Sequence, residues 1–111
     1  MKTIRYNKLV RDFIPEIIQN EQKSCTTSIL DETQYIEELK KKLVEESQEV
    51  MDSKSKEGIV EELADVLEVI EAIQNIFGIQ EADIQCAKAQ KAQKNGRFAQ
   101  RLFLHSVVED K

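Results

Sequence analysis

The stretch that decides the fold is KEGIVEELADVLEVIEAIQNIF, residues 56–77, which is apolar over most of its helical circumference. Apolar side chains recur along it at helical spacing, namely Ile59, Val60, Leu63, Val66, Leu67, Val69, Ile70, Ile73, Ile76 and Phe77. A helix that is apolar on nearly every side is typical of a buried helix. We therefore expect residues 56–77 to form the central helix of a bundle, with a thin solvent face made of Glu61, Glu68, Glu71 and Asn75.

Both ends of this central segment carry helix-boundary signals. Gly78 followed by apolar Ile79 fits a helix C-terminus of the Schellman type. Before the segment, residues 52–55 read as a turn. Upstream of that turn, Asp31 followed by Gln34 is close to a capping-box start, and apolar residues then recur at helical spacing to about residue 51. These signals predict two consecutive long helices.

Shorter helices are expected on either side of this pair. Residues 9–18 read as an extended lead-in followed by a helix, capped by Asp12, in which Pro15 is tolerated because the first turn has no intrahelical N–H to lose. A fourth helix is predicted from about Gln80 to Lys94. Residues 98–104 after it can be extended or form a short helix.

Composition supports an all-α class. The chain has 111 residues, of which 33% are charged and 5% aromatic, with one proline and three glycines. This balance favours helices over a strand-rich sandwich, and the length suits a single domain over residues 1–111. We therefore expect an all-α helical bundle of about four helices. Because residues 56–77 carry more apolar surface than four short helices of one chain can easily cover, we expect a homodimer to complete the bundle.

Charge and targeting signals exclude several classes of protein. The net charge of −5 argues against the broad basic surface of a duplex-binding protein, so nucleic acid is not expected as a partner. Residues 1–8 carry charges where a secretory signal needs an apolar run, and no window has the length of a membrane span. Cys25 and Cys86 lack metal-ligand spacing and are expected to be reduced thiols. We predict a cytoplasmic protein without a membrane partner.

Two pairs of acids recur at a spacing of three residues, Glu46 with Glu49 and Glu62 with Asp65. This spacing puts both members of a pair on one helix face. On a helical wheel Glu46 takes a core position and Glu49 lies at the flank of the apolar arc, while Glu62 and Asp65 fall inside the apolar arc of residues 56–77. Acids of both helices thus face the expected core.

Carboxylates in such a place need positive compensation, because a buried unpaired charge is costly and neighbouring acids repel. Lysine or arginine within the fold, charges of a neighbouring subunit, or divalent cations can supply it. For Glu46 and Glu49 alone, beside the lysines 40–42, a solvated face is the alternative. The matched pair on residues 56–77 favours a metal site, and an oxygen-only ligand set suits Mg²⁺ or Mn²⁺. Iron fits less well, since the Glu-x-x-His element of di-iron bundles is missing and the single histidine, His105, is near the C-terminus.

The order of these acids resembles a known signature. Residues 45–49, Glu-Glu-Ser-Gln-Glu, followed after a turn by residues 62–65, Glu-Leu-Ala-Asp, are similar to the E-E-x-x-E and E-x-x-D motifs of the all-α nucleoside triphosphate pyrophosphohydrolases, the superfamily of MazG and phosphoribosyl-ATP pyrophosphohydrolase. Residues 6–15, YNKLVRDFIP, and residues 61–70 resemble a subgroup of small stand-alone proteins predicted to remove non-standard nucleotides. The similarity covers nearly the whole chain.

The resemblance implies a MazG-like fold and a chemistry. It makes the four acids Mg²⁺ ligands: Glu46, Glu49, Glu62 and Asp65. It also implies cleavage of a nucleoside triphosphate between the α and β phosphates, which releases a monophosphate and pyrophosphate. A carboxylate near the attacking water can act as general base, and Glu49 or Glu45 is the candidate.

The phosphate groups of such a substrate need cations. The N-terminal segment supplies Lys8 and Arg11, and the C-terminal part supplies Lys88, Lys91, Lys94, Arg97 and Arg101. Arg11 and Lys91 match basic positions of the subgroup. The three-residue spacing of the lysines is also typical of a solvated helix face. The subgroup tends to read R-G-G-F where this chain has residues 95–98, Asn-Gly-Arg-Phe.

Two other functions remain open at this stage. One is phosphoribosyl-ATP pyrophosphohydrolase, which shares the carboxylate motif but not the lead-in of residues 9–15. The other is a non-catalytic helical interaction module that has retained the acids. The base and sugar of a nucleotide substrate are not encoded in any of these motifs.

Overall fold

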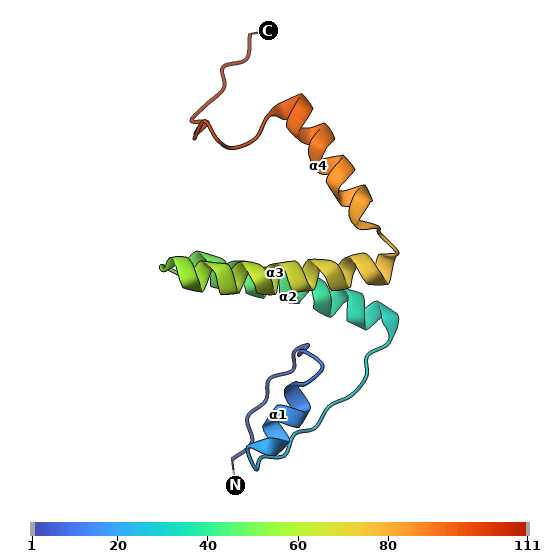
Figure 1. Ribbon diagram of the computed structural model, residues 1–111. Coiled ribbons are helices and arrows are strands. Elements are labelled where there is room, and N and C mark those ends of the chain that lie inside the picture. The colour runs from blue at the N-terminus through green and yellow to red at the C-terminus, as the bar shows by residue number, and fades with distance from the viewer. Residues whose placement is uncertain (1, 111) are drawn as a thin grey trace. The chain divides into compact units, whose positions relative to one another are not determined.

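The computed structural model describes residues 2–110, which form four α-helices joined by turns and irregular segments, with no strand in that range (Figure 1). The helices are α1 (Ile14–Asn20), α2 (Glu32–Asp52), α3 (Lys56–Phe77) and α4 (Glu81–Asn95). The all-α class predicted from the sequence is therefore confirmed. Within residues 2–110, no helix has both the length and the apolar character needed to cross a membrane.

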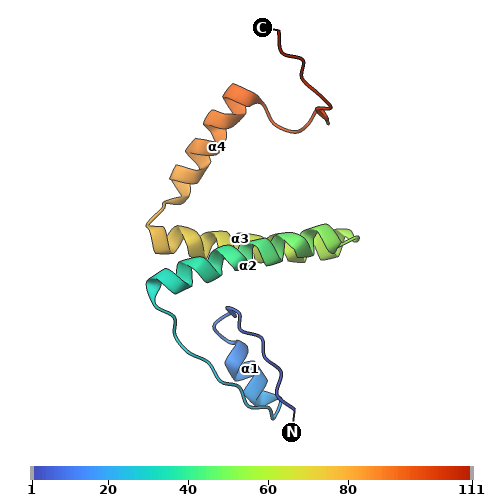
Figure 2. The ribbon, with the colours of Figure 1, turned by 180° about the vertical axis from the view of Figure 1, so that it is seen from behind.

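The chain divides into two compact units, Met1–Gly78 and Ile79–Lys111. In the first unit, α2 and α3 lie side by side and antiparallel, joined by a short turn (Figures 1 and 2). The Asp31 side chain accepts a hydrogen bond from the Gln34 N–H at 2.8 Å, and the Ser55 hydroxyl accepts one from the Gly58 N–H at 3.0 Å. Both helices thus have a side-chain cap at the start, and the boundary predicted at Asp31 is confirmed.

α3 ends as predicted, at a glycine in the left-handed conformation. Gly78 has φ 68°, and its N–H donates to the carbonyl oxygens of Gln74 and Asn75. Glycine adopts this conformation without the steric penalty that a Cβ would add. Two residues later Gln80 caps α4 through a reciprocal pair of hydrogen bonds with Asp83, so this helix also begins within one residue of its predicted start.

The start of α1 differs from the expectation. Asp12 was expected to cap this helix, but Phe13 occupies the N-cap position and makes no side-chain cap hydrogen bond. A turn in which the Ile14 N–H donates to the Arg11 carbonyl at 3.1 Å leads into the helix and leaves Asp12 outside it. Pro15 lies in the first turn, as predicted.

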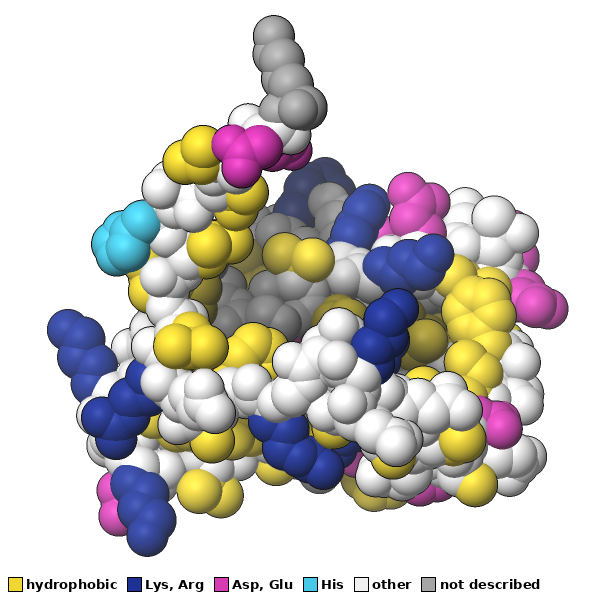
Figure 3. Space-filling view, turned by 90° about the horizontal axis from the view of Figure 1, so that it is seen from above, with side chains coloured by type: hydrophobic (Ala, Val, Ile, Leu, Met, Phe, Trp, Pro, Cys, Tyr) yellow, Lys and Arg dark blue, Asp and Glu magenta, His cyan; other side chains and the backbone are white. Residues whose placement is uncertain are grey.

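The apolar surface of α3 is only partly covered. Among residues 2–110, the buried hydrophobic residues are Leu39 of α2 and Val69 of α3, whereas Val60, Leu63 and Leu67 of α3 are 46–63% exposed. Hydrophobic side chains are visible among the charged ones on the face of the molecule drawn in Figure 3. Within one chain, α3 is therefore packed along α2 but is not enclosed on every side as its sequence predicts.

The second unit contains α4 and the segment that follows it. Residues 98–104 form no helix. A turn closed by the Arg101 N–H and the Phe98 carbonyl oxygen, at 3.2 Å, is followed by irregular and exposed chain through residue 110.

Candidate metal centre

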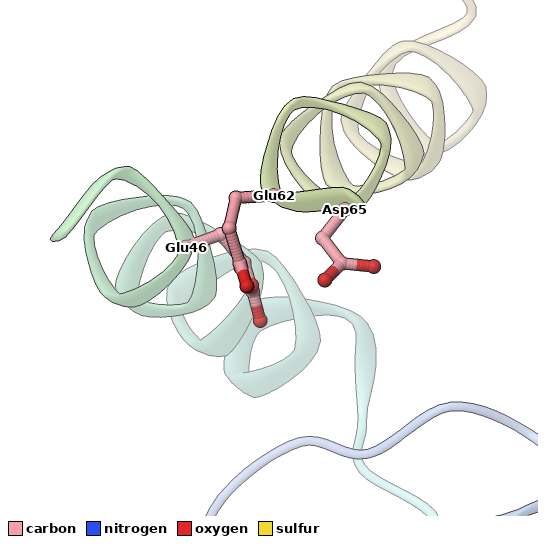
Figure 4. A group of neighbouring side chains, drawn as sticks. All are labelled: Glu46, Glu62 and Asp65. Carbon is pink, nitrogen blue, oxygen red and sulfur yellow. The ribbon is translucent and has the colours of Figure 1, made fainter. Parts of the chain in front are cut away.

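Three of the four predicted ligands converge where α2 and α3 pack together. Glu46 of α2 and Glu62 and Asp65 of α3 each offer a carboxylate oxygen that lies within 4.8 Å of the other two. The three side chains point to the same side of the helix pair (Figure 4). The spacing of three residues places Glu62 and Asp65 on one face of α3, and the antiparallel packing brings Glu46 beside them. All three side chains are partly buried.

Glu49 lies outside this group of three. Its side chain is exposed, which agrees with its position at the flank of the apolar arc of α2. The pKa of Glu62 is raised mainly by its partial burial. Glu49 is nevertheless close enough for its negative charge to raise that pKa further, as other nearby acids do. Its role as a ligand stays a prediction.

Glu62 is the acid in the least favourable electrostatic environment. Desolvation raises the pKa of its carboxyl, and the negative charges of Glu49, Asp65, Glu46 and Glu61 raise that pKa further. Among residues 2–110, no ion pair reaches Glu62, although both other acids of the group have one. The centre therefore carries negative charge that the described chain does not fully compensate.

Two cations of the chain reach the other acids of the centre. Arg11 Nη2 lies 2.6 Å from Asp65 Oδ1, and Lys42 Nζ lies 3.5 Å from Glu46 Oε1. The Arg11 and Asp65 side chains are 56% and 40% exposed, so this pair is open to solvent, whereas Lys42 is only 18% exposed. Cations of the same chain thus neutralise part of the negative charge of this group, which is one of the possibilities that the sequence left open.

Lys42 is the member of this site that sequence reasoning missed. The sequence assigns Lys40, Lys41 and Lys42 to a solvated face with i,i+4 pairing, and does not single out Lys42 as a neighbour of the site. Its Nζ lies 3.5 Å from both Glu45 Oε1 and Glu46 Oε1. The signal was available in the spacing, because residues three and four apart are neighbours on a helix and Lys42 precedes these two acids by three and four positions.

Glu45 has a different environment from Glu62. Its Oε1 lies 3.3 Å from Lys8 Nζ. Partial burial raises the pKa of Glu45, but the hydrogen bond from Lys8 and the charge of Lys42 outweigh it, so the pKa lies below its usual range. Glu45 is therefore ionised at neutral pH and is a weak base.

Replacing Lys8 with methionine is expected to raise the pKa of Glu45 towards its ordinary value, with part of the lowering retained through Lys42. A lowered pKa stabilises the fold above the ordinary glutamate value, and this stabilisation is lost as the pH falls through the folded-state pKa. The loss of stability at acidic pH should therefore be smaller in Lys8→Met than in the wild-type protein. An NMR titration of the Glu45 side-chain carboxyl carbon measures the change, and Lys2→Met is the control. An unchanged Glu45 titration in Lys8→Met would mean that this contact does not form in solution.

The donor set fits a hard divalent cation. Mg²⁺ binds oxygen ligands at about 2.0–2.1 Å in octahedral geometry, so oxygens on opposite sides of the ion are about 4 Å apart. Oxygens within 4.8 Å of one another reach that arrangement through small side-chain adjustments. The three ligands are all carboxylates, which suit Mg²⁺ or Mn²⁺, and their partial exposure leaves room for water and for phosphate oxygens.

The predicted phosphate-binding residues fall in both units. Lys8 and Arg11 lie in the first unit, where they contact Glu45 and Asp65. The others lie in the second unit and are exposed: Lys91 and Lys94 on α4, and Arg97 just after Gly96. The structure thus brings the N-terminal cations to the acids, and the role of the C-terminal ones stays a prediction.

No protein-family model, curated protein or solved structure matches this chain. The resemblance of residues 45–49 and 62–65 to the MazG-like signature stays a prediction. Function is therefore inferred from the arrangement of carboxylates and cations in the first unit.

Proposed function

We propose that this chain is a Mg²⁺-dependent nucleoside triphosphate pyrophosphohydrolase of the MazG-like type, with Mn²⁺ as an alternative ion. It would cleave between the α and β phosphates, release a nucleoside monophosphate and pyrophosphate, and clear non-standard nucleotides in the cytoplasm. The observation that carries the proposal is the convergence of Glu46, Glu62 and Asp65 from two helices, with Arg11 at the edge of the group.

The three acids would hold the cation, with Glu49 as a further ligand or as the base. When bound, the ion supplies positive charge that neutralises the polyphosphate and lowers the pKa of a nearby water. Glu49 is the better of the two candidate bases, because the pKa of Glu45 is lowered by its lysine neighbours. The water oxygen would bond to the α-phosphorus while Glu49 accepts the proton, and the bond to the bridging oxygen would break with pyrophosphate leaving.

Arg11 and Lys8 would bind the phosphates of the substrate. Both now pair with acids in exposed ion pairs. Such pairs contribute little to stability, about 0–1 kcal/mol, so exchanging a carboxylate for a phosphate oxygen costs little. A guanidinium can bind phosphate through two hydrogen bonds at once, which favours Arg11 over Lys8 as the main phosphate-binding residue. We include Lys91, Lys94 and Arg97 in the proposal as further cations from the second unit.

A panel of nucleoside triphosphates with Mg²⁺, scored separately for pyrophosphate and for phosphate, tests the reaction class. The expected result is pyrophosphate from at least one triphosphate, with release abolished by EDTA. Phosphoribosyl-ATP belongs in the panel, since a strong preference for it would favour the histidine-biosynthesis alternative. Absence of pyrophosphate from every member would support the non-catalytic interaction module instead.

A homodimer is part of the proposal, because burying the exposed apolar stripe on α3 against a second copy would be favourable. Val60, Leu63 and Leu67 follow one another at helical spacing and are all exposed, and Val44 and Met51 of α2 are exposed as well. A second copy of the same stripe would bury this surface in a symmetric interface.

Light scattering coupled to size-exclusion chromatography is expected to give twice the 12.8 kDa mass of the chain. Leu67→Glu should shift the protein to monomer, because it puts a charge in the middle of the interface. A monomeric wild-type protein at micromolar concentration would contradict the prediction.

A further inference from the structure

Lys42 has surroundings unlike those of the lysine beside it in α2. Its side chain is 18% exposed, whereas the Lys41 side chain is 67% exposed. Lys41 pairs with Glu37 and Glu38, one turn earlier, as is typical of a solvated helix face. A lysine that is largely withdrawn from water has lost hydration and rotational freedom, so it needs partners that compensate for this loss.

The partners of Lys42 are two adjacent acids, one turn later in α2. Lys42 Nζ lies 3.5 Å from both Glu45 Oε1 and Glu46 Oε1. The Glu46 side chain is only 13% exposed, and it is the acid that α2 contributes to the group with Glu62 and Asp65 (Figure 4). A cation with restricted freedom therefore contacts the carboxylate that α2 brings to the centre.

Glu45 holds Lys42 from a second direction. Its Oε1 accepts a hydrogen bond from Lys8 Nζ at 3.3 Å and also contacts Lys42 Nζ. Charges of alternating sign thus run from Lys8 through Glu45 and Lys42 to Glu46. Glu45 is outside the group of three acids, and its ion pairs are with lysines. The role that this geometry supports for Glu45 is to keep Lys42 in place.

Resting on the function proposed above, we infer that Lys42 is a positioning residue that holds the Glu46 carboxylate where the cation binds, and that Glu45 orients Lys42. A carboxylate has two oxygens, so Glu46 can contact Lys42 through one and a metal ion through the other. Ordering a flexible glutamate side chain before the ion arrives lowers the entropy cost of binding. Partners of this kind typically contribute about 10–100-fold to metal affinity or activity.

Titration calorimetry of Mg²⁺ binding to Lys42→Met tests this role through the sign of the change. Removing a positive charge beside the centre would by itself strengthen the binding of a cation, because the repulsion between the two disappears. Loss of positioning acts in the opposite direction, and we expect a net weakening of about tenfold. Lys42→Arg keeps the charge and can contact both acids, so it should retain most of the wild-type affinity.

Lys41→Met is the matched control. It makes the same change at the adjacent residue, whose partners Glu37 and Glu38 are outside the group of three acids, so Mg²⁺ binding should not weaken. Methionine keeps the apolar part of the lysine side chain, so the helical circular dichroism of Lys42→Met should be unchanged. Lys42→Gln repeats the test with a polar side chain. Mg²⁺ affinity that is unchanged or higher in both Lys42 variants overturns the inference.

The contribution of Glu45 is tested by combining variants. Glu45→Gln should weaken Mg²⁺ binding more in the wild-type background than in Lys42→Met, because part of its effect passes through Lys42. An equal loss in the two backgrounds overturns the role of Glu45 in orienting Lys42.

These titrations contain no nucleotide, so they separate the inference from the proposed reaction. Weaker Mg²⁺ binding in Lys42→Met supports the positioning role even where no triphosphate yields pyrophosphate. Pyrophosphate release together with unchanged Mg²⁺ affinity in that variant leaves the reaction standing and overturns the positioning role. A wild-type protein that binds no Mg²⁺ overturns the metal centre and the positioning role with it.

Discussion

Replacing Asp65 with asparagine is expected to lower pyrophosphate release by at least about 100-fold and to leave the helical circular dichroism unchanged. Changes beside a metal typically cost about 10–100-fold, and loss of a ligand costs more. Asparagine keeps the shape of the side chain but removes the charge that pairs with Arg11 and that the proposed cation would bind. The fold should persist, because the Arg11–Asp65 pair is exposed and exposed pairs contribute little to stability.

The matched control is Asp52→Asn, which makes the same chemical change at the last residue of α2, outside the group of three acids. It should retain wild-type release of pyrophosphate. Wild-type activity in Asp65→Asn would remove this residue from the metal centre, and equal losses in both variants would indicate a general effect on folding.

Replacing Glu62 with glutamine is expected to weaken Mg²⁺ binding by at least about 100-fold and, in the same protein, to raise the melting temperature of the metal-free form. Burial and the surrounding acids raise the pKa of Glu62, so its carboxylate opposes folding at neutral pH. A neutral amide removes that repulsion. Function and stability therefore conflict at this residue, as is common where a site concentrates like charges.

The pH dependence of the melting temperature tests whether the charged Glu62 carboxylate destabilises the fold. A raised folded-state pKa means that the contribution of Glu62 to stability falls as the pH rises from the ordinary glutamate value through the folded-state pKa. The difference in melting temperature between Glu62→Gln and wild type should therefore be largest at neutral pH and vanish in acid. Calorimetry in EDTA across this pH range, beside Mg²⁺ titration calorimetry, measures both effects, with Glu57→Gln as the control. A lower melting temperature in Glu62→Gln would contradict the account.

Local signals in the sequence predicted most of the helix boundaries. The cap at Asp31 and the left-handed end at Gly78 depend on a few adjacent residues, so they are readable without tertiary information. Asp12 shows the limit of this reasoning. A capping residue must lie directly before the first helical residue, and the turn from Arg11 to Ile14 moved that position to Phe13.

The carboxylate group was predictable for a related reason. Helical periodicity decides that Glu62 and Asp65 share a face and that Glu46 points inward, and two helices joined by a short turn must pack antiparallel. The contacts of the N-terminal segment were not predictable in this way. Lys8 and Glu45 are 37 residues apart, and Arg11 and Asp65 are 54 apart, so only the tertiary fold brings these pairs together.

The exposed face of α3 illustrates the same limit. Glu68, Glu71 and Asn75 are exposed, as periodicity predicts, but periodicity does not identify which other segments of the chain lie near that face. Tyr35 and Asp12 come from other segments of the chain and border the same open depression of the surface. The neighbours of this face are therefore visible in the structure and not in the pattern of α3 alone.

Anomalous diffraction from crystals grown with Mn²⁺ and a slowly hydrolysed triphosphate tests the central claim most directly. The account predicts an anomalous peak at bonding distance from carboxylate oxygens of Glu46, Glu62 and Asp65 together, with Arg11 moved from Asp65 to a phosphate. A map with no manganese peak at these three acids, and with Arg11 still paired to Asp65 in the presence of the nucleotide, would contradict it.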